Sequence, residues 1–179
     1  MLNVVFPRIV MLRVVFSTVV LFVVLMAPPV AAQQTPQATD VTSAEIQKFL
    51  NALPRDAISD RPIRVVEVTG EYRVGVYAVF RPLDVQGRAN LHAVNTTEIY
   101  YMVEGVATLV TGGSLIDPTS SVNSTLVRGS GIEGGVSRRV TKGDVIIIPG
   151  RTPHWFSELE TDIEYLIIRT DPDKRIPIR

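Results

Sequence analysis

The stretch from Gly143 to Phe156 reads Gly-Asp-Val-Ile-Ile-Ile-Pro-Gly-Arg-Thr-Pro-His-Trp-Phe, and it does most to decide the fold. A short β-branched run over 145–148 is closed by Pro149, and His154 opens the next run of apolar residues. Short runs of this kind, bounded by glycine and proline, predict β-strands joined by tight turns. We therefore expect an all-β region in which His154 begins a strand.

A second segment lies about fifty residues earlier. It runs from His92 to Gly105 and reads His-Ala-Val-Asn-Thr-Thr-Glu-Ile-Tyr-Tyr-Met-Val-Glu-Gly. The two segments hold both histidines of the chain, and Glu98 follows the first histidine by six positions. Imidazole and carboxylate are common ligands of divalent metals, so this grouping favours a metal site. Taken singly, His92 in a loop and His154 as a half-buried histidine would each have a purely structural explanation.

The rest of the chain extends the all-β pattern. Residues 40–53 have helix signals, with Thr42 or Ser43 as a cap and Pro54 as the end. Residues 112–135 are rich in glycine and serine and predict a loop with a short strand around 125–127. The chain has no cysteine, which excludes disulfides and thiolate metal sites. Further strands are expected over 63–69, 72–80, 98–103, 106–111, 136–140, 145–148, 154–156 and 163–169.

These motifs resemble the cupin superfamily of small jelly-roll β-barrels. Glu98 followed after six residues by Gly105 matches the end of the first cupin motif. Gly143, five residues, Pro149 and then His154 match the second motif. The resemblance covers about residues 64–170. It implies an all-β, cupin-type jelly-roll β-barrel preceded by a short N-terminal helix.

The first motif departs from the family pattern. Counting back from Glu98 places Val94 where cupins have the second histidine of His-x-His, with His92 in the first position. Valine cannot bind a metal, so this alignment implies a degenerate site that has lost one ligand. In an alternative alignment the loop is offset, His92 takes the second position and Asn90 the first. Both alignments remain open at this stage.

The resemblance implies a metal site made by His92, Glu98 and His154. Residues of equal parity on extended strands share a face, so a barrel would point these side chains into its interior. Two histidines and one carboxylate suit iron, manganese or zinc and leave positions for water or substrate. The substrate-binding candidates are Tyr100, Met102, Arg151 and Phe156, with Arg151 as a partner for an anionic group.

The first 32 residues differ in composition from the rest. They contain Arg8 and Arg13, no acidic residue, a mostly apolar run over 14–26 that is short for a membrane span, and Val30 and Ala32 before a cleavage position. This is the layout of a secretory signal peptide cleaved near Ala32, so we expect a secreted or periplasmic protein. An uncleaved membrane anchor is the alternative. The remainder has two more acidic than basic residues, which argues against a nucleic-acid partner, and we expect no membrane association after cleavage.

These observations divide the chain into residues 1–32 as signal peptide, 33–61 as linker and short helix, 62–170 as cupin domain and 171–179 as C-terminal tail. The resemblance implies a metal-dependent enzyme on a small organic molecule, of the oxygenase, isomerase or lyase type. The alternative is a cupin that binds a small ligand without catalysis. A structural or interaction role is a third hypothesis, and the family resemblance also implies a homodimer.

Overall fold

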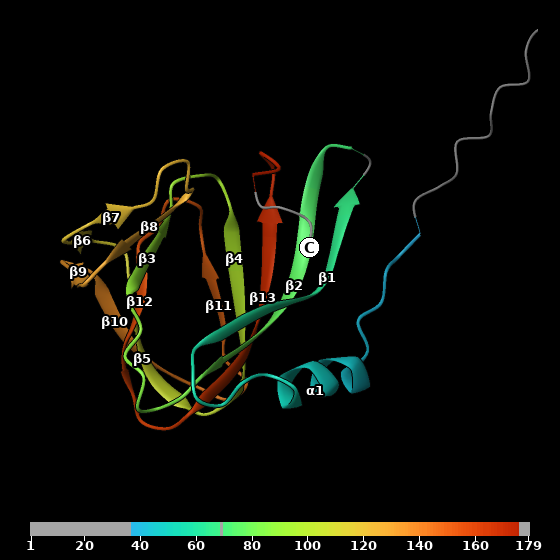
Figure 1. The fold of residues 1–179 in the computed structure, drawn as a ribbon, viewed down its shortest axis with the longest axis horizontal. Coiled ribbons are helices and arrows are strands. Elements are labelled where there is room, and N and C mark those ends of the chain that lie inside the picture. Colours follow the sequence, from blue (N-terminus) through green and yellow to red (C-terminus); the bar gives the residue numbers. More distant parts are fainter. Residues whose placement is uncertain (1–36, 69, 176–179) are drawn as a thin grey trace, which may run out of the picture. The chain divides into compact units, whose positions relative to one another are not determined.

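The computed structural model describes residues 37–68 and 70–175, which form two large antiparallel β-sheets facing each other across a shared core and one small two-stranded sheet (Figure 1). One sheet has the strand order β1-β2-β13-β4-β11, and the other has the order β10-β5-β12-β3-β8-β7. The expected all-β jelly-roll barrel with one short helix is confirmed. The strands are β1 (Ser59–Val68), β2 (Tyr72–Arg81), β3 (Ala89–His92), β4 (Thr97–Glu104), β5 (Val106–Thr111), β6 (Ser114–Ile116), β7 (Thr119–Ser120), β8 (Leu126–Gly129), β9 (Gly131–Glu133), β10 (Val136–Thr141), β11 (Val145–Ile148), β12 (His154–Leu159) and β13 (Ile163–Asp171).

The barrel core lies between the two sheets. Alternate residues of the longer strands point inward, because side chains alternate between the two faces of a strand. On β13, for example, Ile163, Tyr165 and Ile167 are all buried in this core. They meet Leu109 of β5 and Phe156 of β12 from the opposite sheet. Burial of each such side chain contributes about 1.5–3 kcal/mol, and together these contacts hold the two sheets at a fixed separation.

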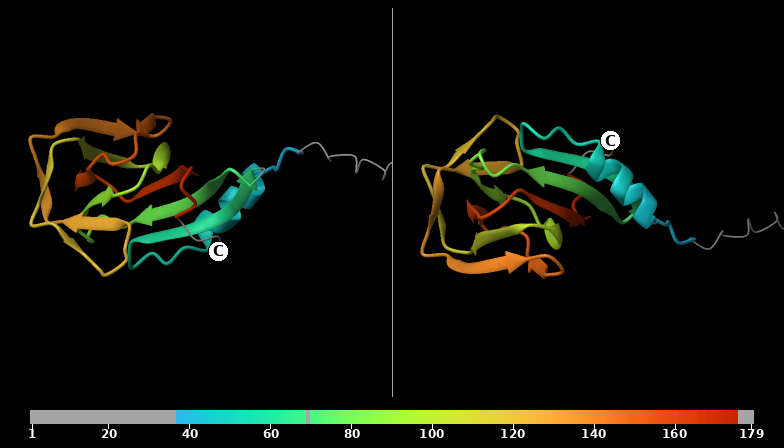
Figure 2. Two further views of the ribbon diagram at one scale, coloured as in Figure 1. Left: turned by 90° about the horizontal axis from the view of Figure 1, so that it is seen from above. Right: turned by 90° about the horizontal axis from the view of Figure 1, so that it is seen from below.

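The single helix among the described residues, α1 (Ser43–Asn51), covers the outer face of the five-stranded sheet. Thr42 is its N-cap and accepts a hydrogen bond from the backbone N–H of Glu45 at 3.2 Å. Leu50 is fully buried and belongs to a second core cluster with Phe80 and Leu166. Figure 2 shows α1 outside the barrel, beside β1 and β2. The predicted helix over 40–53 is therefore confirmed in slightly shorter form.

The region from residue 112 to 135 differs from expectation. Instead of a loop with one short strand, it contains β6, β7, β8 and β9, each two to four residues long. β6 and β9 pair only with each other, whereas β7 and β8 extend the six-stranded sheet. Such short strands carry too few alternating residues to give a periodic sequence signal, so glycine and serine content dominated the prediction.

The expected signal peptide over residues 1–32 and the last residues of the expected tail, 176–179, lie outside the described residues. Among the residues that the structure describes, no helix has the length and apolar character that a membrane span requires.

Candidate metal centre

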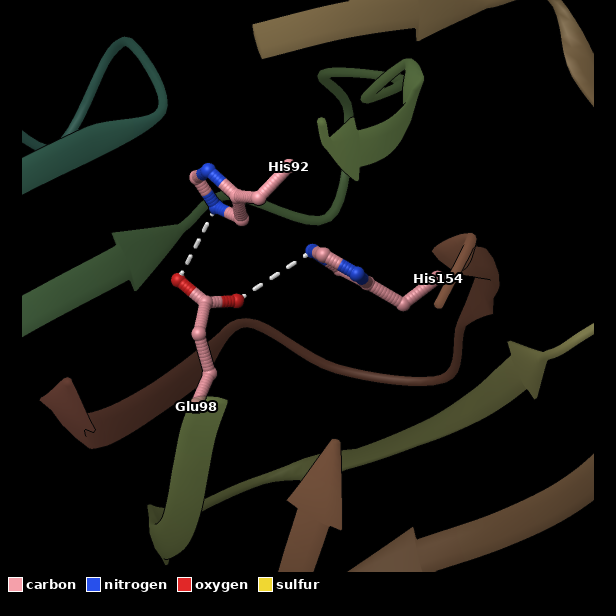
Figure 3. Close-up of side chains that lie close together, drawn as sticks. All are labelled: His92, Glu98 and His154. Carbon is pink, nitrogen blue, oxygen red and sulfur yellow. Dashed lines mark ion pairs between the residues drawn. The ribbon is translucent and has the colours of Figure 1, made fainter. Parts of the chain in front are cut away.

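His92, Glu98 and His154 come together inside the barrel from three different strands. His92 is the last residue of β3, Glu98 is the second residue of β4, and His154 is the first residue of β12. β4 belongs to one sheet and β3 and β12 to the other, so both sheets contribute to the cluster. Their ligand atoms all lie within 4.8 Å of one another. Figure 3 shows both imidazole rings turned toward the carboxylate.

The two histidines contact different oxygens of the same carboxylate. His92 Nε2 lies 3.2 Å from Glu98 Oε1, and His154 Nε2 lies 3.3 Å from Glu98 Oε2. The two imidazole rings are stacked, with centroids 5.9 Å apart. Glu98 is only 1% exposed, so the cluster is largely shielded from solvent.

The protonation of His154 is set by its second nitrogen. His154 Nδ1 lies 3.0 Å from the carbonyl oxygen of Thr152, which can only accept a hydrogen bond, so Nδ1 carries the proton of the neutral ring. Burial lowers the pKa of His154, although the charge of Glu98 opposes this shift. The neutral ring then directs an unprotonated Nε2 at Glu98. This is the tautomer and orientation of a metal-ligating histidine.

The donor set therefore fits a divalent cation. An unprotonated Nε2 of His154 and the ionised Oε2 of Glu98 both act as hydrogen-bond acceptors, and they face each other at 3.3 Å. Two acceptors at this separation repel unless a cation binds both of them. Nitrogen and carboxylate ligands of this kind match zinc, iron or manganese.

Glu98 is also held by two residues of the barrel wall. Arg169 donates from Nε to Oε1 at 2.6 Å, and Tyr100 donates its hydroxyl to Oε2 at 3.0 Å. Burial alone would raise the pKa of Glu98, but the hydrogen bond with His92 and the charge of Arg169 outweigh burial and hold this pKa well below its usual range. Arg169 in turn binds Asp60 Oδ2 at 2.6 Å, which fixes the guanidinium between two carboxylates.

The cluster borders a cavity of about 450 Å³, within the ~300–1,000 Å³ typical of small-molecule sites. Tyr100, Tyr165 and Ile167 provide part of its wall. Besides Glu98 and the two histidines, its charged lining residues are Asp60, Arg81, Arg128, Arg169 and Arg175.

The other substrate-binding candidates lie away from this cavity. Met102 is fully buried and Phe156 is 5% exposed, and both pack in the barrel core, where Phe156 stacks on Tyr100 at 6.1 Å. Arg151 is exposed in the turn before β12 and donates from Nε to Asn95 Oδ1 at 3.2 Å. Of the four candidates, only Tyr100 lines the cavity.

The cavity lining also bears on the two alignments of the first motif. Asn90 and His92 lie two residues apart on β3, and both line the cavity. Val94 follows in the loop before β4 and is not a lining residue. This placement agrees with the alternative alignment, in which Asn90 and His92 occupy the two histidine positions of the family motif.

Arg81 and Arg169 are lining residues that the sequence reasoning missed. Arg81 is the last residue of β2 and lies on the same strand face as Val79. Arg169 of β13 lies on the same strand face as Ile167, and all four residues line the cavity. A charged residue at the inward position of an otherwise apolar strand is the signal that identifies such residues. Near this part of the wall, the indole Nε1 of Trp155 donates to the carbonyl oxygen of Gly87 at 2.9 Å.

Comparison with known proteins gives one family match. A family model described as Cupin matches residues 54–178, which is more than half of the chain. No curated protein matches the chain.

Several solved structures have a similar fold. An rmlc-like cupin protein from Desulfovibrio desulfuricans is 14% identical with a TM-score of 0.46, covering 75% of this chain and 98% of that chain. An rmlc-like cupin family protein with a double-stranded β-helix fold from Methanocaldococcus jannaschii is 14% identical with a TM-score of 0.43, covering 69% and 90%. The DMSP lyase DddQ from Ruegeria pomeroyi is 16% identical with a TM-score of 0.43, covering 71% of this chain and 58% of that chain.

Proposed function

Because the chain belongs to the cupin family, we propose that it binds a divalent metal through His92, Glu98 and His154 and acts on a small organic molecule. The observation that carries the proposal is the convergence of two imidazole nitrogens and one buried carboxylate beside a cavity. The metal is iron, manganese or zinc, and the reaction is of the oxygenase, isomerase or lyase type. A metal bound there supplies Lewis-acid polarisation of a substrate oxygen.

The protein's own residues prepare this site for chemistry. Arg169 and Tyr100 fix the carboxylate of Glu98, and the carbonyl of Thr152 fixes the ring of His154. Ligands held in this way need no reorganisation when a substrate enters. The enclosed barrel wall limits access of water, which strengthens electrostatic interactions inside the cavity.

The test is elemental analysis of the purified protein beside His154→Ala. We expect about one metal ion per chain in the parent and less than a tenth of that in the variant. Chelation should abolish turnover on a panel of small organic substrates, and the metal should restore it. Stoichiometric metal without chelator-sensitive turnover on a broad panel would contradict catalysis, and absence of metal after reconstitution would contradict the metal site.

A second candidate function is a non-catalytic cupin that binds a small ligand. It is favoured by the ion pair of Arg169 with Glu98 at 2.6 Å, because this guanidinium already supplies a cation to the buried carboxylate. This function predicts that a ligand raises the melting temperature of metal-free protein by mass action. It also predicts no chemical change in the bound ligand.

We also propose that the protein is exported. The support is the sequence of residues 1–32, with Arg8, Arg13, the apolar run and the small residues before Ala32. Mass spectrometry of the protein recovered from the periplasm or medium should give an N-terminus at Gln33. Recovery of the intact N-terminus in the membrane fraction would indicate an anchor instead.

The proposed quaternary state is a homodimer that uses the outer face of β11. This strand is at the edge of its sheet, and its Val145 and Ile147 are 61% and 65% exposed. Tyr101, opposite Val145 on β4, is 43% exposed and extends the same apolar face. An exposed apolar edge strand is a common site of self-association, and a second copy of the chain would cover it.

A further inference from the structure

The charges of the cavity are unevenly paired. Among the described residues, its lining includes four arginines but only two carboxylates, Asp60 and Glu98, and both of these bind Arg169. Within residues 37–68 and 70–175, no carboxylate forms an ion pair with Arg81, Arg128 or Arg175. The chain as a whole has a formal net charge of zero, so this excess of cations is a local property of the cavity.

Arg81 is held in a fixed position by its surroundings. Its Nε donates to the hydroxyl of Tyr165 at 2.9 Å, and its guanidinium carbon lies 5.3 Å from the ring centroid of Phe156. Gly87 leaves the space for it, because a Cβ at that position would lie 2.4 Å from Arg81 Nη1. A guanidinium fixed through Nε, stacked on an aromatic ring and fitted against a glycine presents its terminal nitrogens in one orientation.

These terminal nitrogens are unpaired within the described residues, at the wall of the cavity. Neither Nη1 nor Nη2 of Arg81 has a hydrogen-bond partner in the described part of the chain, where Arg81 donates only through Nε. Among the described residues, Thr96 Oγ1 is the only fully buried side-chain polar atom without a hydrogen-bond partner. The terminal nitrogens of Arg81 are therefore not fully buried and retain some accessible surface. Arg81 is a lining residue, so these donors are available to a molecule bound in the cavity.

We propose that the cavity binds a small organic acid and that Arg81 holds its carboxylate through the two terminal nitrogens. The planar guanidinium matches a carboxylate with two parallel hydrogen bonds. This proposal names the class of small molecule for the proposed function. It rests on that function only for the reaction that follows binding. Arg128 and Arg175 are exposed lining residues of the same cavity, and their charges, which have no carboxylate partner in the described part of the chain, favour entry of an anion.

The position of Arg81 relates the anion to the metal centre. Tyr165, which accepts from Arg81, has its ring 4.9 Å from that of Tyr100, and Tyr100 donates to Glu98. A carboxylate bound to Arg81 would place the remainder of a small molecule beside His92, Glu98 and His154.

The experiment measures binding of matched probes to metal-free protein by calorimetry. The probes are benzoate against benzamide, succinate against succinamide, and inorganic phosphate, in chelator and without chloride. We expect at least one acid to bind ten- to hundredfold more tightly than its amide and more tightly than phosphate. Equal binding of acid and amide in both pairs, or a preference for phosphate over both acids, would overturn the proposal.

The variants are Arg81→Gln and, as matched control, Arg151→Gln. Arg151 is exposed outside the cavity, so its variant should bind the preferred acid within about twofold of the parent. Arg81→Gln should lose about tenfold or more in affinity for the acid and little for the amide. Unchanged acid binding in folded Arg81→Gln would overturn the assignment. If that variant does not fold, the acid-to-amide ratio of the parent still decides the proposal. Because metal is absent throughout, failure here is distinct from failure of the metal site.

Discussion

Each carboxylate oxygen of Glu98 contacts one histidine and one hydrogen-bond donor of the barrel wall. Oε1 faces His92 and Arg169, and Oε2 faces His154 and Tyr100. A buried carboxylate is tolerated only when its charge is paired and its lone pairs are satisfied. Glu98 is thus the residue through which the metal centre, the barrel wall and Asp60 are linked.

Glu98→Gln should destabilise the metal-free protein by about 3 kcal/mol, because it removes one of the two carboxylates that compensate the buried charge of Arg169 and leaves only Asp60, whose side chain is 39% exposed. Arg169 has only 13% of its side chain exposed. Urea denaturation in the presence of chelator measures the change.

The control for this variant is Glu160→Gln. Glu160 pairs with Arg139 on the surface, and the two side chains are 43% and 58% exposed. Exposed pairs contribute about 0–1 kcal/mol, so this variant should unfold nearly like the parent. Equal losses in both variants would show that burial of the Glu98–Arg169 pair has no special effect.

The stability of the metal-free protein should fall as the pH decreases from 7 to 4. The pKa of His154 is lowered from its ordinary 6.5, chiefly by burial, so below pH 6.5 the unfolded chain binds a proton that the folded protein does not. The pKa of Glu98 is lowered from 4.5, and its contribution is lost below that pH in the same direction. Denaturation midpoints at several pH values measure both effects, and a His154→Gln variant should lack the decline that begins near pH 6.5. A flat profile from pH 7 to 4 in the parent would contradict the prediction.

Residue type and spacing were sufficient to predict that His92, Glu98 and His154 lie together. Few other side chains bind metals, and the chain has only two histidines. The arginines of the wall were harder to predict. Arg81 and Arg169 come at or near the ends of their strands, where a charge is ordinarily solvated. Their equal parity with the buried Val79 and Ile167 is the sequence signal, and the pairing of β2 with β13 confirms that these side chains turn inward.

At the scale of elements, the turns of the two motifs depend on glycines with positive φ. Gly105 joins β4 to β5 with φ of 90°, and Gly143 precedes β11 with φ of 91°. A Cβ at Gly105 would lie 2.1 Å from the backbone oxygen of Asp162, whereas a Cβ at Gly143 would meet nothing within 4 Å. An alanine at Gly143 would therefore meet only backbone strain, whereas an alanine at Gly105 would meet backbone strain and a steric clash.

Gly143→Ala should cost about 1–2 kcal/mol, from the unfavourable left-handed conformation alone. Gly105→Ala should cost at least about 2 kcal/mol more, because the β4–β5 turn must also move away from Asp162. Thermal and urea unfolding of the two variants measure the difference. Similar losses of stability in both variants would mean that the loop at Asp162 moves away from the new Cβ without a measurable free-energy cost.

The longer strands were predictable from alternation and β-branched residues, and the runs 106–111 and 145–148 coincide with β5 and β11. β3 was missed because it has four residues, Ala-Asn-Leu-His, with no β-branched member. Its pairing with β8 and β12 defines it as a strand. This pairing fixes the position of His92 at the end of β3. Pairing between strands that are distant in the sequence cannot be predicted from a four-residue segment alone.

At the scale of the whole molecule, the described residues leave the apolar edge at β11 exposed. α1 packs on the outer face near β1 and β2, but β11 at the opposite edge of the same sheet carries exposed Val145 and Ile147. Natural sheets seldom leave such an edge without protection or a partner.

Ile147→Lys should convert the proposed homodimer into a monomer, because a charge buried in an apolar interface is strongly unfavourable. Light scattering after gel filtration should give twice the mass of one chain for the parent and once for the variant. Val122→Lys is the control, since Val122 is 91% exposed in the turn before β8 and should not change the mass. A monomeric parent would contradict the proposed dimer.

Trp155 is the only tryptophan of the chain and directly follows His154. Its indole N–H binds the carbonyl of Gly87, the residue against which Arg81 Nη1 packs. Its emission therefore comes from one place, next in sequence to the proposed metal ligand His154 and in contact with the glycine that borders Arg81. The intrinsic fluorescence of the unlabelled protein can thus follow metal loading and acid binding in the same titration, with each event read as its own change in intensity or wavelength.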